Sequence, residues 1–461
     1  MRQTNFALAL LVAAVLAACG GSKGGDQTLK AQYSGQVTFG DSLSDVGTYA
    51  VGGVAALGGG KFTINGNSVA VKPEFTGKTW TELLAAQFGL AAPCAAQTGL
   101  DGNAAQNFSV PVMNHAGCFG YAQGGARVTH PVGPNNKLTG SPLGHLTVPV
   151  STQIASHLAK VNGAFKGTEI VFVLAGGNDA LMQLGQLAAG ATAAGTAAGN
   201  AAAANTFATR LISLLAAGAT SPSAAAQAIG IAFQTEAARP GSTQASMVGA
   251  AIGAAAVQPG NAAVGAPAVH GPMIATATAD ATAAGNTAGA AAGAQYAATN
   301  GPLAVAAMAT AGAELGALVK TQIVAKGATR VVVNALPDLS ISPSALAQPA
   351  ATQGLIKAMI EAFNNQLKTA IAAEAKVLYV DLYTVSRDQA ANPGPYGLSN
   401  TTTPACGANA LGASSLVCNV NNLGAGDVSH YMFADDVHPT PFEHLLIARY
   451  VAAQMTIKGW L

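Results

Sequence analysis

The chain has 461 residues, of which 9% are charged and 50% hydrophobic, and its formal net charge is +1. Charged residues usually make up about a quarter of a soluble protein, and much of the hydrophobic share here is alanine, so the composition overstates the true core. The near-zero charge, without a dense lysine and arginine cluster, argues against nucleic acid as a partner. The length allows one α/β domain with insertions.

The N-terminus predicts an export signal. Arg2 begins a short positive region, and the apolar run over 6–18 is too short to span a bilayer. The following Cys19-Gly20 resembles the processing site of bacterial lipoproteins, in which the cysteine is lipidated. We expect a signal peptide over 1–18 and a flexible tether over 19–32. Gly20 favours the outer membrane of a Gram-negative bacterium. An ordinary secretory signal with an incidental cysteine is the alternative.

Four further cysteines remain in the mature chain: Cys94, Cys118, Cys406 and Cys418. An exported compartment permits disulfides, and four cysteines allow three connectivities. We favour the two local pairs, Cys94–Cys118 and Cys406–Cys418. Neither a Cys-x-x-Cys nor a His-Glu-x-x-His motif occurs in the sequence, so we expect no metal and no cofactor.

A glycine-aspartate-serine turn follows the first strand-like run. The β-branched and apolar residues before Gly40 favour a strand, and the residues after Ser42 can open a helix. A strand end fixes the serine Cα, while the glycine permits a tight bend. Serine is a weak nucleophile that needs a base, a group that orients the base, and donors for the oxyanion. We interpret Ser42 as a candidate nucleophile.

Helical spacing and apolar runs then alternate along the chain, which favours a parallel sheet. Residues 91–118 are predicted as an irregular loop. The run over 169–175 suits a buried strand and ends in Gly-Gly-Asn-Asp, at the strand end where ligands bind in open α/β sheets. The other predicted elements are helices over 80–88, 151–159, 355–373 and from about 441 to 450, and strands over 329–335 and 376–381.

An alanine- and glycine-rich stretch interrupts this pattern over 181–300. Residues 206–217 and 303–325 read as helices. The piece over about 218–300 is weakly specified, because alanine favours helix whereas glycine, threonine and proline oppose it. We expect a largely helical insertion there, which either forms hairpins that cap the site or is partly disordered. A membrane helix is disfavoured because polar residues recur.

Near the C-terminus, Asp435 and His438 form an Asp-x-x-His motif. At this spacing the carboxylate can fold back onto the imidazole Nδ1, which leaves Nε2 free to act as a base. Asp436 is the neighbouring alternative, with a poorer geometry. His430 and His444 are expected to be ordinary surface or packing residues.

These motifs in their chain order resemble the GDSL lipase/esterase family of the SGNH hydrolase superfamily. The resemblance covers about residues 33–180 and 302–455. It rests on Gly-Asp-Ser-Leu at 40–43, Tyr-Ala-Gln-Gly-Gly-Ala at 121–126, Gly-Gly-Asn-Asp at 176–179, the strand and Leu-Pro-Asp turn at 329–339, and Asp-x-x-His-Pro at 435–439. The gap between Asn178 and Thr329 is long for this family.

The resemblance implies a flavodoxin-like three-layer α/β/α sandwich with a central parallel sheet of about five strands. The hydrolase domain would span 33–455, interrupted by the insertion at about 218–300. Position 44 is serine, so the Gly-x-Ser-x-Gly elbow of α/β-hydrolases is absent at Ser42.

The resemblance also implies the roles of individual residues. Ser42 would be the nucleophile, His438 the general base, and Asp435 the residue that orients it. The oxyanion would be held by the backbone N–H groups of Ser42 and Gly125 and by the side-chain amide of Asn178, a neutral donor that does not quench the base.

Two neighbouring choices complete the assignment. Gly125 is preferred over Gly124 because it directly precedes Ala126, as in the family pattern. Asp45 is expected to brace the serine turn.

The expected function is therefore that of a serine ester hydrolase that cleaves carboxylic acyl esters through an acyl-enzyme. The expected partners are an acyl ester or lipid substrate and a membrane, contacted through the N-terminal lipid, and the protein is expected to be a monomer. The alternatives are an acyltransferase to a lipid or sterol acceptor, a phospholipase, and a non-catalytic surface or adhesion protein. Fold and triad do not set the substrate.

Overall fold

The computed structural model describes residues 32–66 and 77–461, which divide into two compact units. Unit 1 is formed by the described residues of Met1–Leu184 and Leu303–Leu461, and unit 2 is Gly185–Pro302. The predicted signal peptide, Cys19 and nearly all of the tether lie outside the described residues, so those expectations stay predictions.

Unit 1 is built on a parallel sheet, which confirms the predicted α/β class. Its strands are β1 (Gln36–Gly40), β4 (Ile170–Leu174), β5 (Val331–Asn334) and β6 (Val377–Val380), in the order β1-β4-β5-β6. All five residues of β4 and all four of β5 are buried. Burial on both faces explains why their sequences are continuous apolar runs rather than alternating ones.

The sheet of the described residues has four strands, not about five. On the outer side of β1, a fifth segment makes only an isolated parallel bridge between Thr38 and Gly120. The Thr38 N–H donates to the Phe119 carbonyl at 3.1 Å, and the Tyr121 N–H donates to the Thr38 carbonyl at 2.8 Å. The Gly124-Gly125 turn follows at once, so the segment is too short to extend the ladder.

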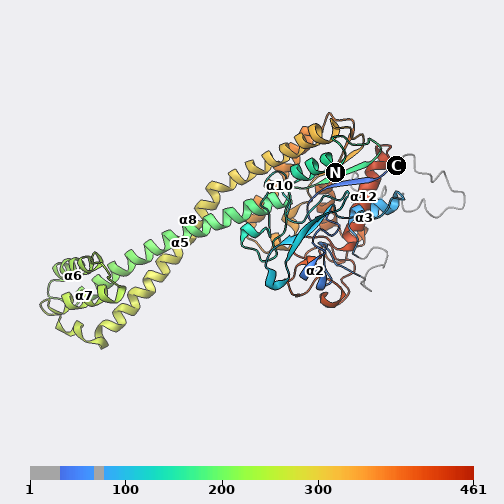
Figure 1. Cartoon of the computed structure of the whole chain (residues 1–461). Coiled ribbons are helices and arrows are strands. Elements are labelled where there is room, and N and C mark those ends of the chain that lie inside the picture. The colour runs from blue at the N-terminus through green and yellow to red at the C-terminus, as the bar shows by residue number, and fades with distance from the viewer. Residues whose placement is uncertain (1–31, 67–76) are drawn as a thin grey trace. The chain divides into compact units, whose positions relative to one another are not determined.

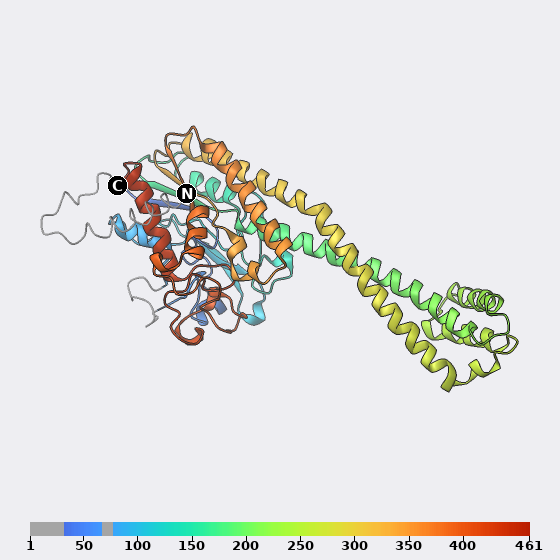
Figure 2. The ribbon, with the colours of Figure 1, turned by 180° about the vertical axis from the view of Figure 1, so that it is seen from behind.

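Helices cover both faces of the sheet (Figures 1 and 2). Phe172 of β4 packs on the ring of Trp80 in α3 (Trp80–Gln87), whereas Phe39 of β1 packs on His157 in α4 (Val150–Lys160). Phe39 pairs with Val173, and successive strand residues face opposite sides, so α3 and α4 lie on opposite faces. The flavodoxin-like layering itself stays a prediction.

The remaining elements of unit 1 frame this sheet. The C-terminal α12 packs against α3 and β6, and α10 also contacts β6. Their bounds, with those of the shorter helices, are α2 (Gly52–Ala56), α9 (Pro343–Leu346), α10 (Ala350–Ile371), α11 (Leu382–Ala391) and α12 (Pro441–Ile457).

The predicted irregular loop over 91–118 is wrong in part, because it contains a β-hairpin. Strands β2 (Gln97–Asp101) and β3 (Ser109–Asn114) pair antiparallel, with a register shift between Thr98 and Leu100. Every β3 residue is exposed except Val110, which is half-buried. The segment therefore lacks the alternation of buried and exposed residues that marks a strand in sequence.

Both favoured disulfides are present in the structure. Cys94–Cys118 brackets the β2–β3 hairpin with a Cα–Cα distance of 5.1 Å, and Cys406–Cys418 closes a loop with a Cα–Cα distance of 6.0 Å. Each bond closes a local loop, and such a closure lowers the entropy of the unfolded chain.

Unit 2 is helical throughout most of its length. It contains the C-terminal part of α5 (Gly177–Ala216), then α6 (Pro222–Ala237) and α7 (Gln244–Ala256), and the N-terminal part of α8 (Pro267–Leu318), which a π-helix over Val319–Val324 continues. Its own small core is formed by Phe207, Leu211, Leu215, Ile229 and Phe233. Most of the residues expected in the insertion are thus helical. Unit 2 is wider than the expected insertion at about 218–300, whose bounds stay a prediction.

Glycines let α5 and α8 pack closely within unit 2. A Cβ on Gly289 would lie 2.9 Å from the Gly195 carbonyl oxygen, and a Cβ on Gly199 would lie 2.9 Å from the Gly285 carbonyl oxygen. Because these neighbours are backbone atoms, they cannot rotate away. By length and composition alone, Pro267–Val324 is also apolar enough to cross a bilayer, a test that buried helices of soluble proteins pass as well.

The glycine contacts predict that a Gly→Ala substitution, which usually stabilises a helix, destabilises unit 2 where α5 and α8 meet. Gly289→Ala should destabilise unit 2, because the added methyl group meets the Gly195 carbonyl. The matched control Gly253→Ala in α7, where a Cβ would meet nothing within 4 Å, should stabilise it by about 0.5–1 kcal/mol through helix propensity. Chemical denaturation followed by circular dichroism measures both, and equal stabilisation by the two changes would contradict the close packing.

Candidate active site

The turn that carries Ser42 leaves the sheet in tight contact with β4. A Cβ on Gly40 would lie only 2.2 Å from the Leu174 carbonyl oxygen, so only glycine fits at this position. The same carbonyl accepts the Asp41 N–H at 3.3 Å. Ser42 follows directly and is 7% exposed, at the wall of a pocket of about 210 Å³.

Ser42, His438 and Asp435 form one hydrogen-bonded chain. The Ser42 Oγ lies 2.9 Å from His438 Nε2, and His438 Nδ1 lies 2.9 Å from both carboxylate oxygens of Asp435. The structure therefore brings together the three residues that the sequence proposed as nucleophile, base and orienting acid. Asp436, the neighbouring alternative, is exposed.

Backbone N–H groups hold the Asp435 carboxylate in place. Its Oδ1 accepts the N–H groups of Val437 at 3.0 Å and His438 at 2.8 Å, and its Oδ2 accepts the Ser415 N–H at 2.8 Å. Ser415 belongs to the loop closed by the Cys406–Cys418 disulfide. These three backbone N–H groups fix the carboxylate opposite the imidazole.

The Asp435 carboxylate favours the protonated, positively charged form of the His438 imidazole. Burial lowers the pKa of His438, but the adjacent Asp435 carboxylate more than offsets this and holds the pKa above its usual value. Burial also raises the pKa of Asp435, whereas the imidazole charge and the hydrogen bonds outweigh it and keep the pKa below the usual range. An imidazolium formed during a reaction would therefore be stabilised.

Asp41 is a second carboxyl at this pocket. Burial raises the pKa of Asp41 to about 7, although its Oδ1 accepts the Leu43 N–H at 3.1 Å. Its charge in turn raises the pKa of His438. Other charged or titratable groups that act on this site are Asp179, which raises the pKa of Asp41, and the buried His145 and His444.

The three expected oxyanion donors face the same pocket. Gly125 and Asn178 line it together with Ser42 and His438. Among the described residues, neither the Ser42 N–H nor the Gly125 N–H has a hydrogen-bond acceptor. The Asn178 side-chain amide donates one N–H to the Ala126 carbonyl at 2.9 Å, which fixes its orientation and leaves the second N–H available.

Two carboxylates that the motifs do not explain tie the donor segments together. Asp45 accepts the N–H groups of Gly47, Thr48 and Gly124 at 2.8–2.9 Å, so it joins the serine turn to the segment that carries Gly125. It was expected only to brace the turn. Burial raises the pKa of Asp45 to about 6.

Asp179 makes the corresponding link on the other side. Its Oδ1 accepts Nε–H of Arg127 at 2.9 Å, and its Oδ2 accepts the Val128 N–H at 3.0 Å. Asn178 and Asp179 lie in the first turn of α5, so the side chains at this helix end bond to the segment that follows Gly125. Sequence reasoning missed Arg127, because nothing in the sequence pairs it with a residue 52 positions away.

Gln153 of α4 is a third support, and sequence reasoning missed it. Its Oε1 accepts the Gly40 N–H at 2.9 Å, and its Nε2 donates to the Gly40 carbonyl at 2.8 Å. A primary amide is suited to this task because it carries a donor and an acceptor side by side. The backbone two residues before Ser42 is thereby fixed from the helix layer.

The other histidines near the site are packing residues. His444 is buried and accepts the Trp80 N–H at 3.3 Å, and His145 is buried and stacks on Tyr49 with a centroid distance of 4.1 Å. Burial lowers the pKa of each to about 3, so both stay neutral. Phe62 packs on the His438 ring, with 4.9 Å between the two ring centroids.

Within the described ranges, no cluster of three His, Cys, Asp or Glu side chains is suited to a metal ion.

Part of the chain is similar to proteins of one known family. Residues 273–451 match the family model described as GDSL-like Lipase/Acylhydrolase, a region that holds Asp435 and His438 but not Ser42. A GDSL esterase/lipase of Arabidopsis thaliana is 36% identical over 81 residues, which are 18% of this chain and 22% of the relative.

Two further relatives give the same picture. The GDSL esterase/lipase APG of Arabidopsis thaliana is 25% identical over 144 residues, which are 29% of this chain and 41% of the relative. Lipase 1 of Photorhabdus luminescens is 32% identical over 77 residues, which are 17% of this chain and 12% of the relative. The chain thus matches less than half the length of each of these relatives. Together, the family model and the relatives support the assignment of this chain to the GDSL lipase/acylhydrolase family.

Proposed function

We propose that the protein is a serine ester hydrolase that cleaves carboxylic acyl esters through an acyl-enzyme. The observation that carries this proposal is the hydrogen-bonded chain Ser42–His438–Asp435 at a pocket with two unpaired backbone N–H groups. Family membership indicates action on esters in general. The serine mechanism is the more specific step, and it rests on the geometry.

The proposed reaction gives each group of the site a defined role. His438 Nε2 takes the proton of Ser42 Oγ as the oxygen attacks the ester carbonyl, and Asp435 stabilises the imidazolium. The N–H groups of Ser42 and Gly125 and the Asn178 amide hold the oxyanion. The imidazolium then gives its proton to the leaving alcohol, and water resolves the acyl-enzyme by the same steps.

The walls of the pocket support an apolar acyl group as the part of the substrate that binds there. Phe62, Leu181, Leu339 and Val437 line the pocket beside the nucleophile, with Pro134 at its rim. Burial of a hydrocarbon chain against them would stabilise binding by roughly 0.8 kcal/mol per methylene group. We therefore propose esters of fatty acids, including lipids, as the substrate class.

The N-terminal sequence supports a proposed location for this activity. Lipidation of Cys19 would hold the enzyme at a membrane surface, and the residue after Cys19 favours the outer membrane of a Gram-negative bacterium. The two disulfides fit an oxidising compartment outside the cytoplasm.

Removal of the nucleophile should abolish turnover. With p-nitrophenyl esters of increasing acyl length, Ser42→Ala should lose at least about a thousandfold in kcat, because no other group can form the acyl-enzyme. The thermal unfolding midpoint should stay near that of the wild type, and the exposed Ser399→Ala should keep full activity. Retained activity in Ser42→Ala would remove the assignment, and acyl transfer to an added alcohol in place of hydrolysis would indicate the acyltransferase alternative.

The side-chain amide of Asn178 should contribute to the rate but not to substrate binding. Asn178→Ala is expected to lower kcat about 10²- to 10³-fold with little change in KM, as for other oxyanion donors. Asn135 is an exposed residue that lines the same pocket, and its backbone φ is positive, at 64°. Because glycine adopts a positive φ without strain, Asn135→Gly is the matched control and should change kcat only slightly. Similar kcat losses in the two variants would mean that Asn178 has no special role.

The pH dependence should report the carboxylates beside His438. Only the neutral imidazole acts as a base, so kcat/KM should rise with pH through a midpoint above 6.5. Asp41→Asn removes a charge that raises the pKa of His438, so this midpoint should move to lower pH. The exposed Asp436→Asn serves as control, with little shift expected. A midpoint unchanged by Asp41→Asn would show that the two groups do not interact.

A further inference from the structure

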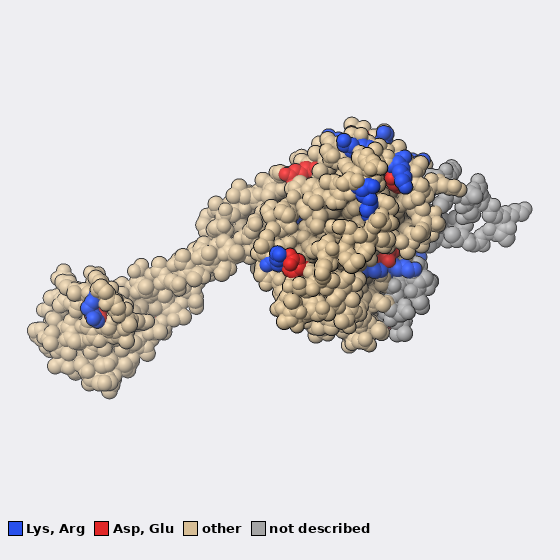
Figure 3. Space-filling model, in the orientation of Figure 1, with Lys and Arg blue, Asp and Glu red and all other residues tan. Residues whose placement is uncertain are grey.

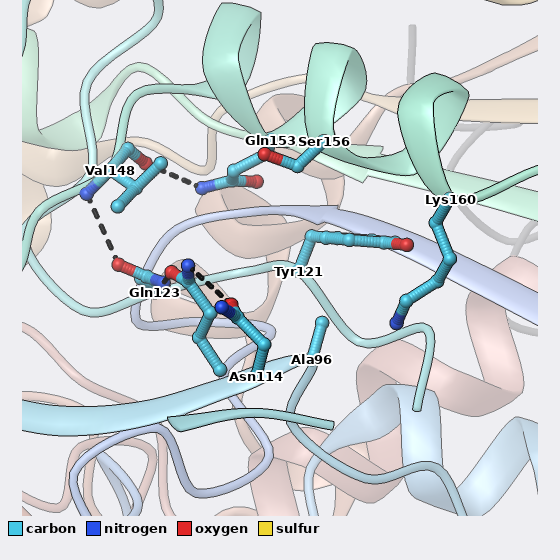
Figure 4. Close-up of a pocket in the computed structure, with 9 residues that line it drawn as sticks. Ala96, Asn114, Tyr121, Gln123, Val148, Gln153, Ser156 and Lys160 are labelled. Atoms are coloured by element: carbon cyan, nitrogen blue, oxygen red, sulfur yellow. Dashed lines mark hydrogen bonds between the residues drawn. The ribbon is translucent and has the colours of Figure 1, made fainter. Parts of the chain in front are cut away.

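A second pocket of about 160 Å³ lies between the β2–β3 hairpin and α4 (Figure 4). It shares no lining residue with the pocket at Ser42. Its walls carry amides, the hydroxyl groups of Tyr121 and Ser156 and one ammonium group, and no carboxylate is among its lining residues. The lining residues that matter here are Ala96, Gln97, Asn114, Tyr121, Gln123 and Lys160.

The side-chain amides of this pocket form a directed relay. The Val148 N–H donates to Gln123 Oε1 at 3.1 Å, Gln123 Nε2 donates to Gln97 Oε1 at 3.0 Å, and Gln97 Nε2 donates to Asn114 Oδ1 at 2.9 Å. Because the first donor is a backbone N–H, the direction of every later bond is fixed. The relay ends at Asn114, and among the described residues the Asn114 Nδ2 and the second N–H of Gln97 have no acceptor, so both can donate to a ligand.

Lys160 supplies the only ammonium group of the pocket. Its Nζ donates to the carbonyl groups of His115 at 2.8 Å and Cys118 at 2.7 Å, which leaves one of its three N–H donors. Among the described residues, no carboxylate lies within ion-pair distance of it. The Nζ also lies over the rings of Phe119 and Tyr121, at 5.0 and 5.4 Å from their centroids.

These groups converge on one space from opposite sides. In Figure 4, Lys160 enters from α4 and Asn114 from β3, with Tyr121 and Ala96 between them. The pocket therefore has a cation at one side, spare amide donors at the other, and an apolar wall between them. A ligand that fits this arrangement carries one negative charge, several acceptor oxygens and a short carbon skeleton.

We propose that this pocket binds a small organic carboxylate, with its charge at Lys160 and its other oxygen atoms at the amides of Gln97 and Asn114. A cationic ligand would be repelled by the ammonium group, and a neutral sugar would leave the ammonium group without a counter-charge. A phosphate dianion would keep one charge unpaired. The proposal does not rest on the hydrolase activity, because it concerns a separate pocket.

Isothermal titration calorimetry tests this proposal with the full-length Ser42→Ala variant and 4-oxopentanoate as the probe, because this keto acid carries one carboxylate and a separate acceptor oxygen. 4-Oxopentanoate should bind with a dissociation constant in the millimolar range or tighter, and Lys160→Met should weaken it at least about tenfold, as expected for loss of a charged hydrogen bond. Lys166→Met, an exposed lysine six residues further along, is the matched control and should leave the affinity unchanged.

A second variant guards against a folding defect, because Lys160 also holds two loop carbonyl groups. Asn114 is exposed, so Asn114→Ala should fold normally and still weaken 4-oxopentanoate binding severalfold, because it removes a donor to the keto oxygen. Absent binding, affinity that Lys160→Met does not change, or tighter binding of glucose or inorganic phosphate than of 4-oxopentanoate would each overturn the proposal. Binding of 4-oxopentanoate at the Ser42 pocket would give the second of these outcomes.

Discussion

The parallel pairing of β1 with β4 is the constraint on which the site depends. Gly40 lies opposite Leu174, so the two strands end at the same edge, and the residues that follow them leave the sheet together. Ser42 follows one strand, and Asn178 follows the other after a short turn. A serine hydroxyl and a side-chain amide 136 positions apart are thereby placed at one pocket. The absence of a side chain on Gly40 is what allows the turn to pass so close to β4.

Buried polar groups then hold this edge in a single arrangement. Asp45 joins the serine turn to Gly124, Asp179 joins α5 to the segment after Gly125, and Gln153 fixes Gly40 from the helix layer. None of the three contacts the Ser42 hydroxyl. A buried carboxylate or amide is costly unless it is hydrogen-bonded, and here Asp45 and Gln153 bond to backbone groups, whereas Asp179 bonds to one backbone N–H and to the Arg127 side chain. In this way a fold made of strands and helices fixes the three loops that meet at the pocket.

The sequence allowed the chemical groups to be predicted, because each stands beside a strong local signal. Ser42 follows a strand and a glycine, Asn178 follows a continuous apolar run, and Asp435 is three residues from His438. Their catalytic roles stay predictions, although the structure places them together. What the sequence could not reveal are contacts between distant positions, such as Arg127 with Asp179, since one sequence carries no signal that pairs them. The β2–β3 hairpin escaped prediction because its exposed side chains do not alternate.

Unit 2 contains very few charged residues. Its four charged residues form two ion pairs, Arg210 with Asp280 and Arg239 with Glu236, and Figure 3 shows a surface otherwise almost free of charge. This has a consequence for proteolysis. Trypsin-like enzymes cut after lysine or arginine, and residues 167–319 offer them only two such bonds, one of which is followed by Pro240. Proteases with small specificity pockets, which accept alanine, are the ones for which this unit is a substrate, and only after its helices open locally.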